Sequence, residues 1–251
     1  MKFTQLFSKS PEINALSAAR LFLFASRDVW FVVGLPIFLH DALGWGFSGV
    51  GAFLAAWIVG YGLVQAAAPR FLGRSAAVGS RSAQSWGFVL ALVSAGIALA
   101  VQAEFHPTAS ILIGLAIFGV VFAVNSSLHS YLILAYTDMD NVALNVGFYY
   151  MANAAGRLLG TLLSGVAYIA GGLPGCLWTS TALVVANALL TLRLPAAWSR
   201  GPRAGCRQSR PISEDHCAAG RFLLALSGQE ALYNLAVNVR QATVNPVVAK
   251  C

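Results

Sequence analysis

The stretch LSAARLFLFASRDVWFVVGLPIFL at residues 16–39 decides the fold. It is long enough to cross a hydrocarbon core about 30 Å thick, which takes about 20 mainly apolar residues of helix. Yet it also contains Arg20, Arg27 and Asp28. A charge near the middle of a bilayer costs roughly 2.5 to 3.5 kcal/mol on insertion scales, so charges there usually have a function. The stretch therefore predicts a membrane-spanning helix that carries a polar site.

The composition of the whole chain agrees with a membrane protein. Of its 251 residues, 58% are hydrophobic and 10% are charged, whereas soluble domains carry about 25% charged residues. Six segments are apolar enough to span a bilayer, namely residues 16–39, 47–68, 85–101, 111–136, 143–170 and 173–192. Because a backbone in lipid must satisfy its own hydrogen bonds, we predict an all-α, polytopic membrane bundle of about six helices.

The chain divides into two parts by composition. Residues 1–195 are predicted to form the six-helix transmembrane domain, and residues 196–251, rich in proline, glycine and arginine, a basic and flexible cytoplasmic tail. Cytoplasmic loops retain Lys and Arg. With the N-terminus inside, the three external loops contain neither residue, so both termini are predicted to be cytoplasmic.

Several other function classes are disfavoured. The net charge of +7 does not indicate nucleic-acid binding, because the basic residues lie mainly in connections and in the tail instead of on one face. The four cysteines lack metal-ligand spacing, so no metal site and no cofactor are predicted. The spans contain no GxSxG or HExxH motif and no paired catalytic aspartates, which argues against an enzyme.

Two arginines near the middle of the bilayer are the main candidates for a substrate site. At about 1.5 Å per residue, Arg27 lies roughly 17 Å into the first span and Arg157 roughly 21 Å into the fifth. Two guanidinium groups at similar depth could clamp a carboxylate or a phosphate. The alternative is a structural ion pair of Asp28 with one arginine. One carboxylate cannot neutralise both, so positive charge should remain for an anion.

Polar side chains extend the face that carries Arg157. Asn145, Tyr149 and Asn153 precede it at intervals of four residues, so all four share one side of a helix. We predict that Asn153 and Tyr149, with Asn125 of the fourth span, contribute to substrate binding in a water-filled cavity. The alternative is that such residues make hydrogen bonds between helices.

His129 and Asp28 are candidates for ion coupling. The charge of a histidine changes near neutral pH, so His129 could relay protons, although a hydrogen-bonded packing histidine is an equal alternative. The third and sixth spans contain no charged residue and are therefore predicted to face lipid.

Glycine and proline positions predict how the spans pack and bend. Gly156 and Gly160 have the GxxxG spacing, with Gly165 further along, and such glycines allow helices to approach closely. Pro36 is predicted to kink the first span beyond its charged pair, because proline removes a backbone donor.

Three stretches resemble the C-terminal half of major facilitator superfamily permeases, specifically the ArsJ-type organoarsenical efflux permeases. They are residues 2–39, GYGLVQAAAPRFLGR at residues 60–74, and LNVGFYYMANAAGRLLGTLLSG at residues 144–165. The resemblance covers residues 2–195. It implies that the six spans are the seventh to twelfth helices of a twelve-helix transporter, with the first, second, fourth and fifth spans here bordering the cavity.

The same resemblance implies a function. The substrate would be 1-arseno-3-phosphoglycerate, exported across the bacterial inner membrane to give arsenate resistance. The implied partners are glyceraldehyde-3-phosphate dehydrogenase, as the source of the substrate, and either an N-terminal transporter half or a second copy of the chain. The alternatives are a major facilitator transporter of another substrate, or a transport-inactive half that acts as a scaffold.

Overall fold

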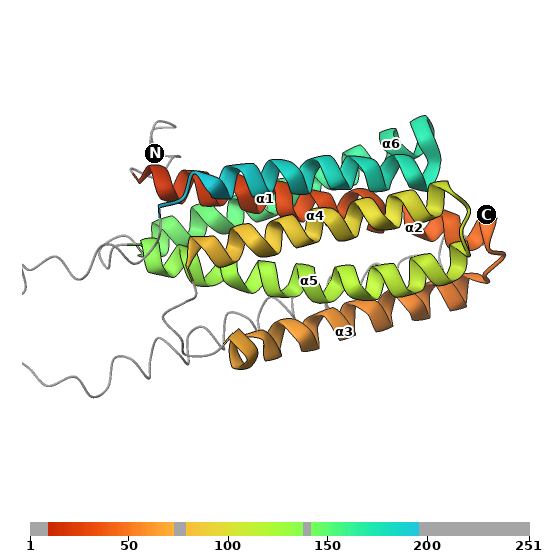
Figure 1. Cartoon of the computed structure of the whole chain (residues 1–251), viewed down its shortest axis with the longest axis horizontal. Coiled ribbons are helices and arrows are strands. Elements are labelled where there is room, and N and C mark those ends of the chain that lie inside the picture. Colours follow the sequence, from red (N-terminus) through yellow and green to blue (C-terminus); the bar gives the residue numbers. More distant parts are fainter. Residues whose placement is uncertain (1–9, 73–78, 138–141, 196–251) are drawn as a thin grey trace, which may run out of the picture.

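A computed structural model describes residues 10–72, 79–137 and 142–195, and every regular element among them is helical. The elements are α1 (Pro11–Phe31), α2 (Gly34–Ile37), the π-helical turn η2 (Phe38–Ala42), α3 (Phe47–Leu72), α4 (Ser80–Gln102), α5 (Pro107–Tyr136) and α6 (Val142–Leu192). The long helices lie along one common direction, with α3 at the edge of the bundle (Figure 1). The all-α prediction is confirmed. The predicted tail lies outside the described residues.

The element α6 contains two helices joined by a reversal. A straight helix of its 51 residues would be about 76 Å long, far more than a bilayer needs. The helix breaks at Gly171 and Gly172, and Gly172 has φ 60° and ψ −153°, a conformation essentially restricted to glycine. Beyond the break, the Sγ of Cys176 lies 3.6 Å from the carbonyl oxygen of Ser164. The two halves therefore run back along each other.

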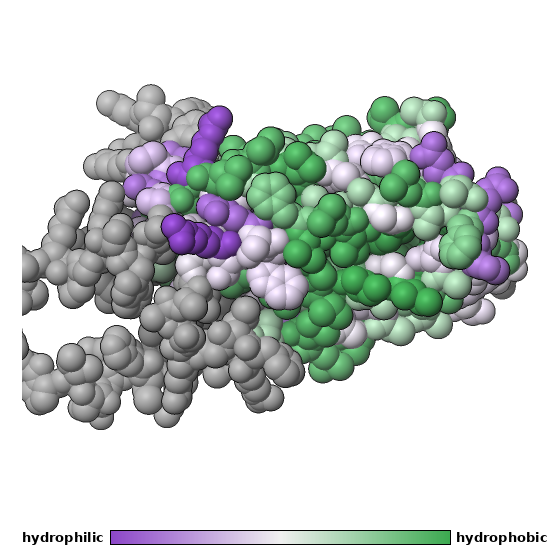
Figure 2. Space-filling model, viewed as in Figure 1, coloured by the Kyte–Doolittle hydropathy of each residue, from purple (hydrophilic) through white to green (hydrophobic). Residues whose placement is uncertain are grey.

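Five helices of the described residues are long and apolar enough to cross a membrane: Pro11–Ala42, Phe47–Ala68, Ser80–Gln102, Pro107–Tyr136 and Leu144–Leu192. Because the fifth contains both halves of α6, these helices account for the six predicted spans. Apolar residues cover the middle of the visible face, and hydrophilic residues gather toward its two ends (Figure 2), as expected for a bundle surrounded by lipid.

The first span is interrupted close to the proline that the sequence singled out. The helix α1 ends at Phe31, and the chain resumes as α2 at Gly34 before continuing into the π-helical turn. Pro36 has no N–H to donate to the carbonyl of Val32, one turn earlier, whereas the next residue, Ile37, donates normally to the carbonyl of Val33 at 3.3 Å. The predicted irregularity is confirmed, and it begins just before the proline.

Two glycines bring the first half of α6 (residues 142–170) close to α1. A Cβ atom at Gly156 would overlap the backbone of Leu21, and one at Gly160 would lie 2.6 Å from the carbonyl oxygen of Ala25. Both positions therefore require the absence of a side chain. Gly165, in contrast, has nothing within 4 Å of such an atom. The packing prediction is confirmed for the GxxxG pair and wrong for Gly165.

The second half of α6 (residues 173–192) packs on α4 through hydroxyl groups. The Ser94 hydroxyl donates to Oγ of Ser180 at 3.3 Å and accepts from Thr181 at 3.0 Å. Large apolar residues such as Leu92 and Leu189 are exposed on the outer faces of the same helices. The prediction that the third and sixth spans face outward is thus right for one face of each helix, and their other faces form a contact that the absence of charge did not predict.

Aromatic rings connect α3 to the centre of the bundle. The ring of Trp30 on α1 makes edge contacts with Trp57 on α3 and with Phe118 on α5, at centroid distances of 5.8 and 5.2 Å. The Trp57 indole N–H donates to the carbonyl oxygen of Leu115 at 2.8 Å. These contacts hold α3, the least buried of the candidate spans, beside the part of α1 that carries the charges.

Candidate functional site

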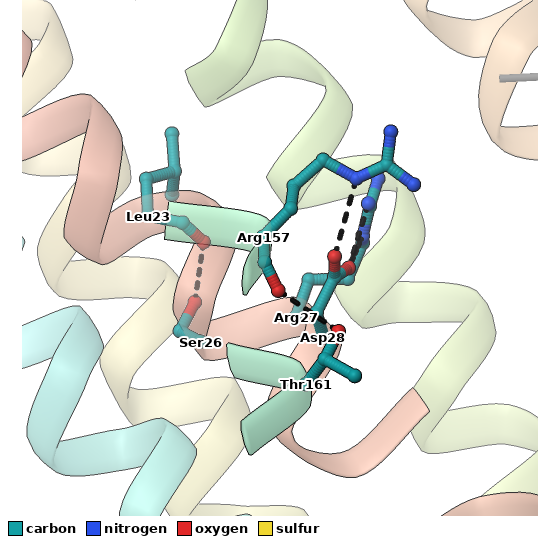
Figure 3. A network of polar contacts seen from close by, with 6 residues as sticks. All are labelled: Leu23, Ser26, Arg27, Asp28, Arg157 and Thr161. Atoms are coloured by element: carbon teal, nitrogen blue, oxygen red, sulfur yellow. Dashed lines mark hydrogen bonds and ion pairs between the residues drawn. The ribbon is translucent and has the colours of Figure 1, made fainter. Parts of the chain in front are cut away.

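The predicted charges converge on one carboxylate. Asp28 accepts from Arg27, its neighbour on α1, with Nη2 at 2.6 Å and Nε at 2.7 Å from Oδ1. The Nε of Arg157, from the first half of α6, lies 3.3 Å from the other oxygen, Oδ2. Figure 3 shows both guanidinium groups on the same carboxylate. Both arginines therefore contact Asp28. The alternative raised from the sequence, an ion pair of Asp28 with one arginine, is present here with both of them.

Backbone packing places Arg157 within reach of Asp28. Gly160 lies one helical turn beyond Arg157, and a Cβ atom there would lie 2.9 Å from the Cβ of Asp28. The hydroxyl of Thr161 donates to the Arg157 carbonyl at 2.9 Å, as a side chain one turn along commonly does in a helix. The glycine contact thus fixes how closely the arginine approaches the acid.

The members of the ion cluster differ in exposure. The side chains of Arg27 and Asp28 are 8% and 3% exposed, and that of Arg157 is 25% exposed. Burying an ion pair costs several kcal/mol per ion, which the mutual attraction must offset. Two guanidinium groups and one carboxylate carry a net charge of +1. Arg157 is the member through which an external anion could reach this charge.

Aromatic rings surround the inner arginine. The guanidinium carbon of Arg27 lies 5.1 Å from the ring centroid of Phe24, 5.6 Å from that of Phe122 and 6.0 Å from that of Tyr61. A cation over an aromatic face is attracted by the ring quadrupole. Of these rings, only Phe24 could have been found from the sequence, because it precedes Arg27 by three residues on the same helix.

Arg20 forms a second cationic contact that sequence reasoning did not place in the site. Its Nη1 donates to both the carbonyl and the hydroxyl oxygen of Ser126 on α5, each at 2.9 Å. Its guanidinium carbon lies 4.2 Å from the ring centroid of Phe24 and 4.9 Å from that of Tyr149 on α6. Arg20 is fully buried, so it connects three helices and does not present its charge at the surface.

The predicted stripe on α6 is buried to different extents along its length. Asn145 and Tyr149 are buried, and Asn153, one turn before Arg157, is partly buried. The Tyr149 hydroxyl lies 3.5 Å from Oγ of Ser130, and its ring stacks against Arg20 as described above. Tyr149 thus contacts Arg20 and Ser130, whereas Asn153 lies one helical turn before Arg157 of the ion cluster.

The two remaining predicted residues lie inside the bundle. Asn125 and His129 on α5 are fully buried. Neither side chain has a hydrogen-bond partner in the described part of the chain. Phe122 and Leu128, on the same helix, belong to the apolar core. Within the described residues, no hydrogen bond joins Asn125 or His129 to the Arg27–Asp28–Arg157 cluster.

Within residues 10–72, 79–137 and 142–195, no group of three or more His, Cys, Asp or Glu side chains could hold a metal ion. The site consists of guanidinium, carboxylate, amide and aromatic groups. Such a set can bind and orient an anion through charge-assisted hydrogen bonds.

Comparison with known proteins gives one family. A family model described as Major Facilitator Superfamily matches residues 16–240. The match includes all six spans and continues beyond residue 195 into the segment predicted as a tail. No curated protein matches the chain.

Proposed function

The chain belongs to the Major Facilitator Superfamily, and we propose that it exports an anionic small molecule whose negative groups bind Arg157 and Arg27. As a member of this family, the chain is a multi-pass membrane transporter of a small molecule, is surrounded by lipid and is not an enzyme. The anionic nature of the substrate and the direction of transport are the proposal.

One observation supports the anionic substrate most directly. Arg27 and Arg157 come from different helices and meet on a single carboxylate. Charges inside a membrane usually pair so that they compensate one another, yet this cluster holds more positive than negative charge. An arginine fork also matches the oxygens of a phosphate or carboxylate in a bidentate manner. A substrate with such a group would complete the cluster.

The proposed binding step is an exchange at Arg157. Its Nε is 3.3 Å from Oδ2 of Asp28, and its side chain is the most exposed of the three. Its bond to Asp28 is therefore longer than that of Arg27, and an anion can reach it more easily. An arriving anion would accept hydrogen bonds from Arg157, while Arg27 keeps Asp28 at 2.6 Å. Asn153, one turn away on the same helix, would add an amide contact to the bound molecule.

The other predicted residues have less direct parts in this proposal. Tyr149 and Asn125 are buried within the six-helix unit, so we do not include them among the first contacts, and their contribution to substrate binding stays a prediction. Proton coupling through His129 or Asp28 also stays a prediction, as does the cytoplasmic position of both termini.

We propose 1-arseno-3-phosphoglycerate as the substrate, on the resemblance of residues 2–39, 60–74 and 144–165 to organoarsenical efflux permeases. This molecule carries several negative charges, which suits binding to a cluster with net positive charge. In this proposal glyceraldehyde-3-phosphate dehydrogenase supplies the substrate, the bacterial inner membrane holds the transporter, and an N-terminal half or a second copy of the chain supplies the opposite wall of the cavity.

The experiment measures survival in arsenate of a sensitive bacterial host that expresses the chain with the dehydrogenase, with and without an N-terminal half. We expect protection, and we expect Arg157→Gln and Arg27→Gln to abolish it at equal membrane abundance. Arg81→Gln is the matched control, because Arg81 is exposed at the start of α4.

Two results would contradict the proposal. Protection that survives both arginine changes would exclude the cluster as the anion site. No protection in any arrangement, with the protein present in the membrane, would exclude this substrate and favour another substrate or an inactive half.

A further inference from the structure

Two polar side chains of α5 lie in the core of the six-helix unit without a hydrogen-bond partner in the part of the chain that the structure describes. Asn125 and His129 are both 0% exposed. Neither the oxygen nor the nitrogen of the Asn125 amide has a hydrogen-bond partner among the described residues, and the same holds for both ring nitrogens of His129. Four polar atoms on neighbouring turns of one helix are therefore buried without a protein partner.

Such an arrangement is costly unless another molecule completes it. A buried donor or acceptor without a partner costs about 1 to 3 kcal/mol, and about 90% or more of buried polar groups in native structures are hydrogen-bonded to protein or to ordered water. Two such side chains one helical turn apart therefore favour a small polar molecule as their common partner.

The geometry limits what the ligand can be. Residues at i and i+4 lie on one face of a helix with Cβ atoms about 5 to 6 Å apart, so one small molecule can reach both Asn125 and His129. The amide offers two donors and an acceptor, and a neutral imidazole offers one donor and one acceptor. The ligand must therefore both donate and accept. Water has this property and needs two to four polar partners in a buried site.

The surroundings of the pair are polar on one side. Ser126, between the two residues in sequence, accepts hydrogen bonds from Arg20 and, at its carbonyl, also from the hydroxyl of Ser130 at 3.1 Å. Ser130 in turn lies 3.5 Å from the hydroxyl of Tyr149. A polar layer thus crosses from α1 through α5 to α6 at the level of the pair, and waters there would extend it.

We propose that Asn125 and His129 bind water inside the six-helix unit, at a site separate from the Arg27–Asp28–Arg157 cluster. This site does not depend on the identity of the transported substrate. It would make the layer at Arg20 a hydrated level inside the bundle.

The test is radiolytic hydroxyl labelling of the full chain in lipid nanodiscs, read residue by residue by mass spectrometry. Radicals generated from a bound water modify the side chains beside it, even where bulk solvent cannot reach. We expect His129 to be modified at a rate comparable with exposed His106 and well above buried Leu90, after correction for intrinsic reactivity. Modification of His129 no faster than that of Leu90 would overturn the proposal.

A pair of variants separates bound water from general opening of the bundle. Asn125→Leu removes one side of the site, so labelling of His129 should be largely lost, and Asn125→Val, which keeps the volume but not the amide, serves if the leucine variant does not fold. Asn187→Leu is the matched control, because Asn187 on α6 is equally buried and its amide atoms also lack partners, but it faces Gly87 on α4. Labelling of His129 that persists when Asn125 is replaced would also overturn the proposal.

Discussion

The two halves of α6 pack against their neighbours by different chemistry. The first half meets α1 through Gly156, Gly160 and an ion cluster. The second half meets α4 through Ser94 and Ser180 and contains no charged residue. Hydroxyl contacts in membranes are weak and tolerant of change, whereas a buried charge demands its partner. Of the two contacts, the one with α1 should therefore be the more sensitive to substitution.

The largest expected effect comes from removing the acid of the cluster. Asp28→Asn leaves two arginines without their common carboxylate, and breaking a buried ion pair costs about 3 to 5 kcal/mol. We expect a matching loss of stability in detergent, measured by the unfolding free energy. Adding Arg157→Gln should recover part of the loss. If Asp28→Asn is no less stable than the original chain, the ion cluster does not make the contact of α6 with α1 stronger than its contact with α4.

The second effect tests the close approach of α1 and α6. Gly160→Ala places a methyl group against the Ala25 carbonyl and the Asp28 Cβ, and inserting atoms into a well-packed contact costs about 1 to 3 kcal/mol. Gly165→Ala is the control on the same helix, since nothing lies within 4 Å of the added atom. Thermal unfolding of both variants should separate them clearly. Equal unfolding temperatures would contradict the packing.

The smallest effect is expected at the other contact. Ser94→Ala removes the hydrogen bonds that join Ser94 to Ser180 and Thr181, and such bonds between membrane helices average about 0.6 kcal/mol. We expect a small change in unfolding temperature and no change in transport. A loss as large as that of Asp28→Asn would show that the two halves of α6 do not differ in the way proposed here.

The sequence was sufficient to predict the spans and the residues that carry charge. Length and apolar composition located all six segments, and the GxxxG spacing identified Gly156 and Gly160 as contact positions. Pro36 marked the irregular end of the first span. These features are local, because each depends on residues within one helix and on the properties of the bilayer.

The sequence could not predict which side chains meet across helices. The i, i+4 rule placed Tyr149 and Arg157 on one face, but only the fold shows that Tyr149 contacts Arg20 while Arg157 contacts Asp28. The rings of Tyr61 and Phe122 around Arg27 are distant in sequence and carry no motif. Such contacts depend on the relative rotation and height of whole helices, which spacing along a single chain does not specify.

The reversal at Gly172 has a mechanical consequence. The first half of α6 packs on α1, and the second half packs on α4 and, through Cys176, on Gly34 of α2. A displacement between α1 and α4 would therefore act on the link between the two halves. The φ of 60° and ψ of −153° at Gly172 lie where side chains are essentially not tolerated. The pivot between the charged and the uncharged halves of the helix therefore depends on the absence of a single methyl group.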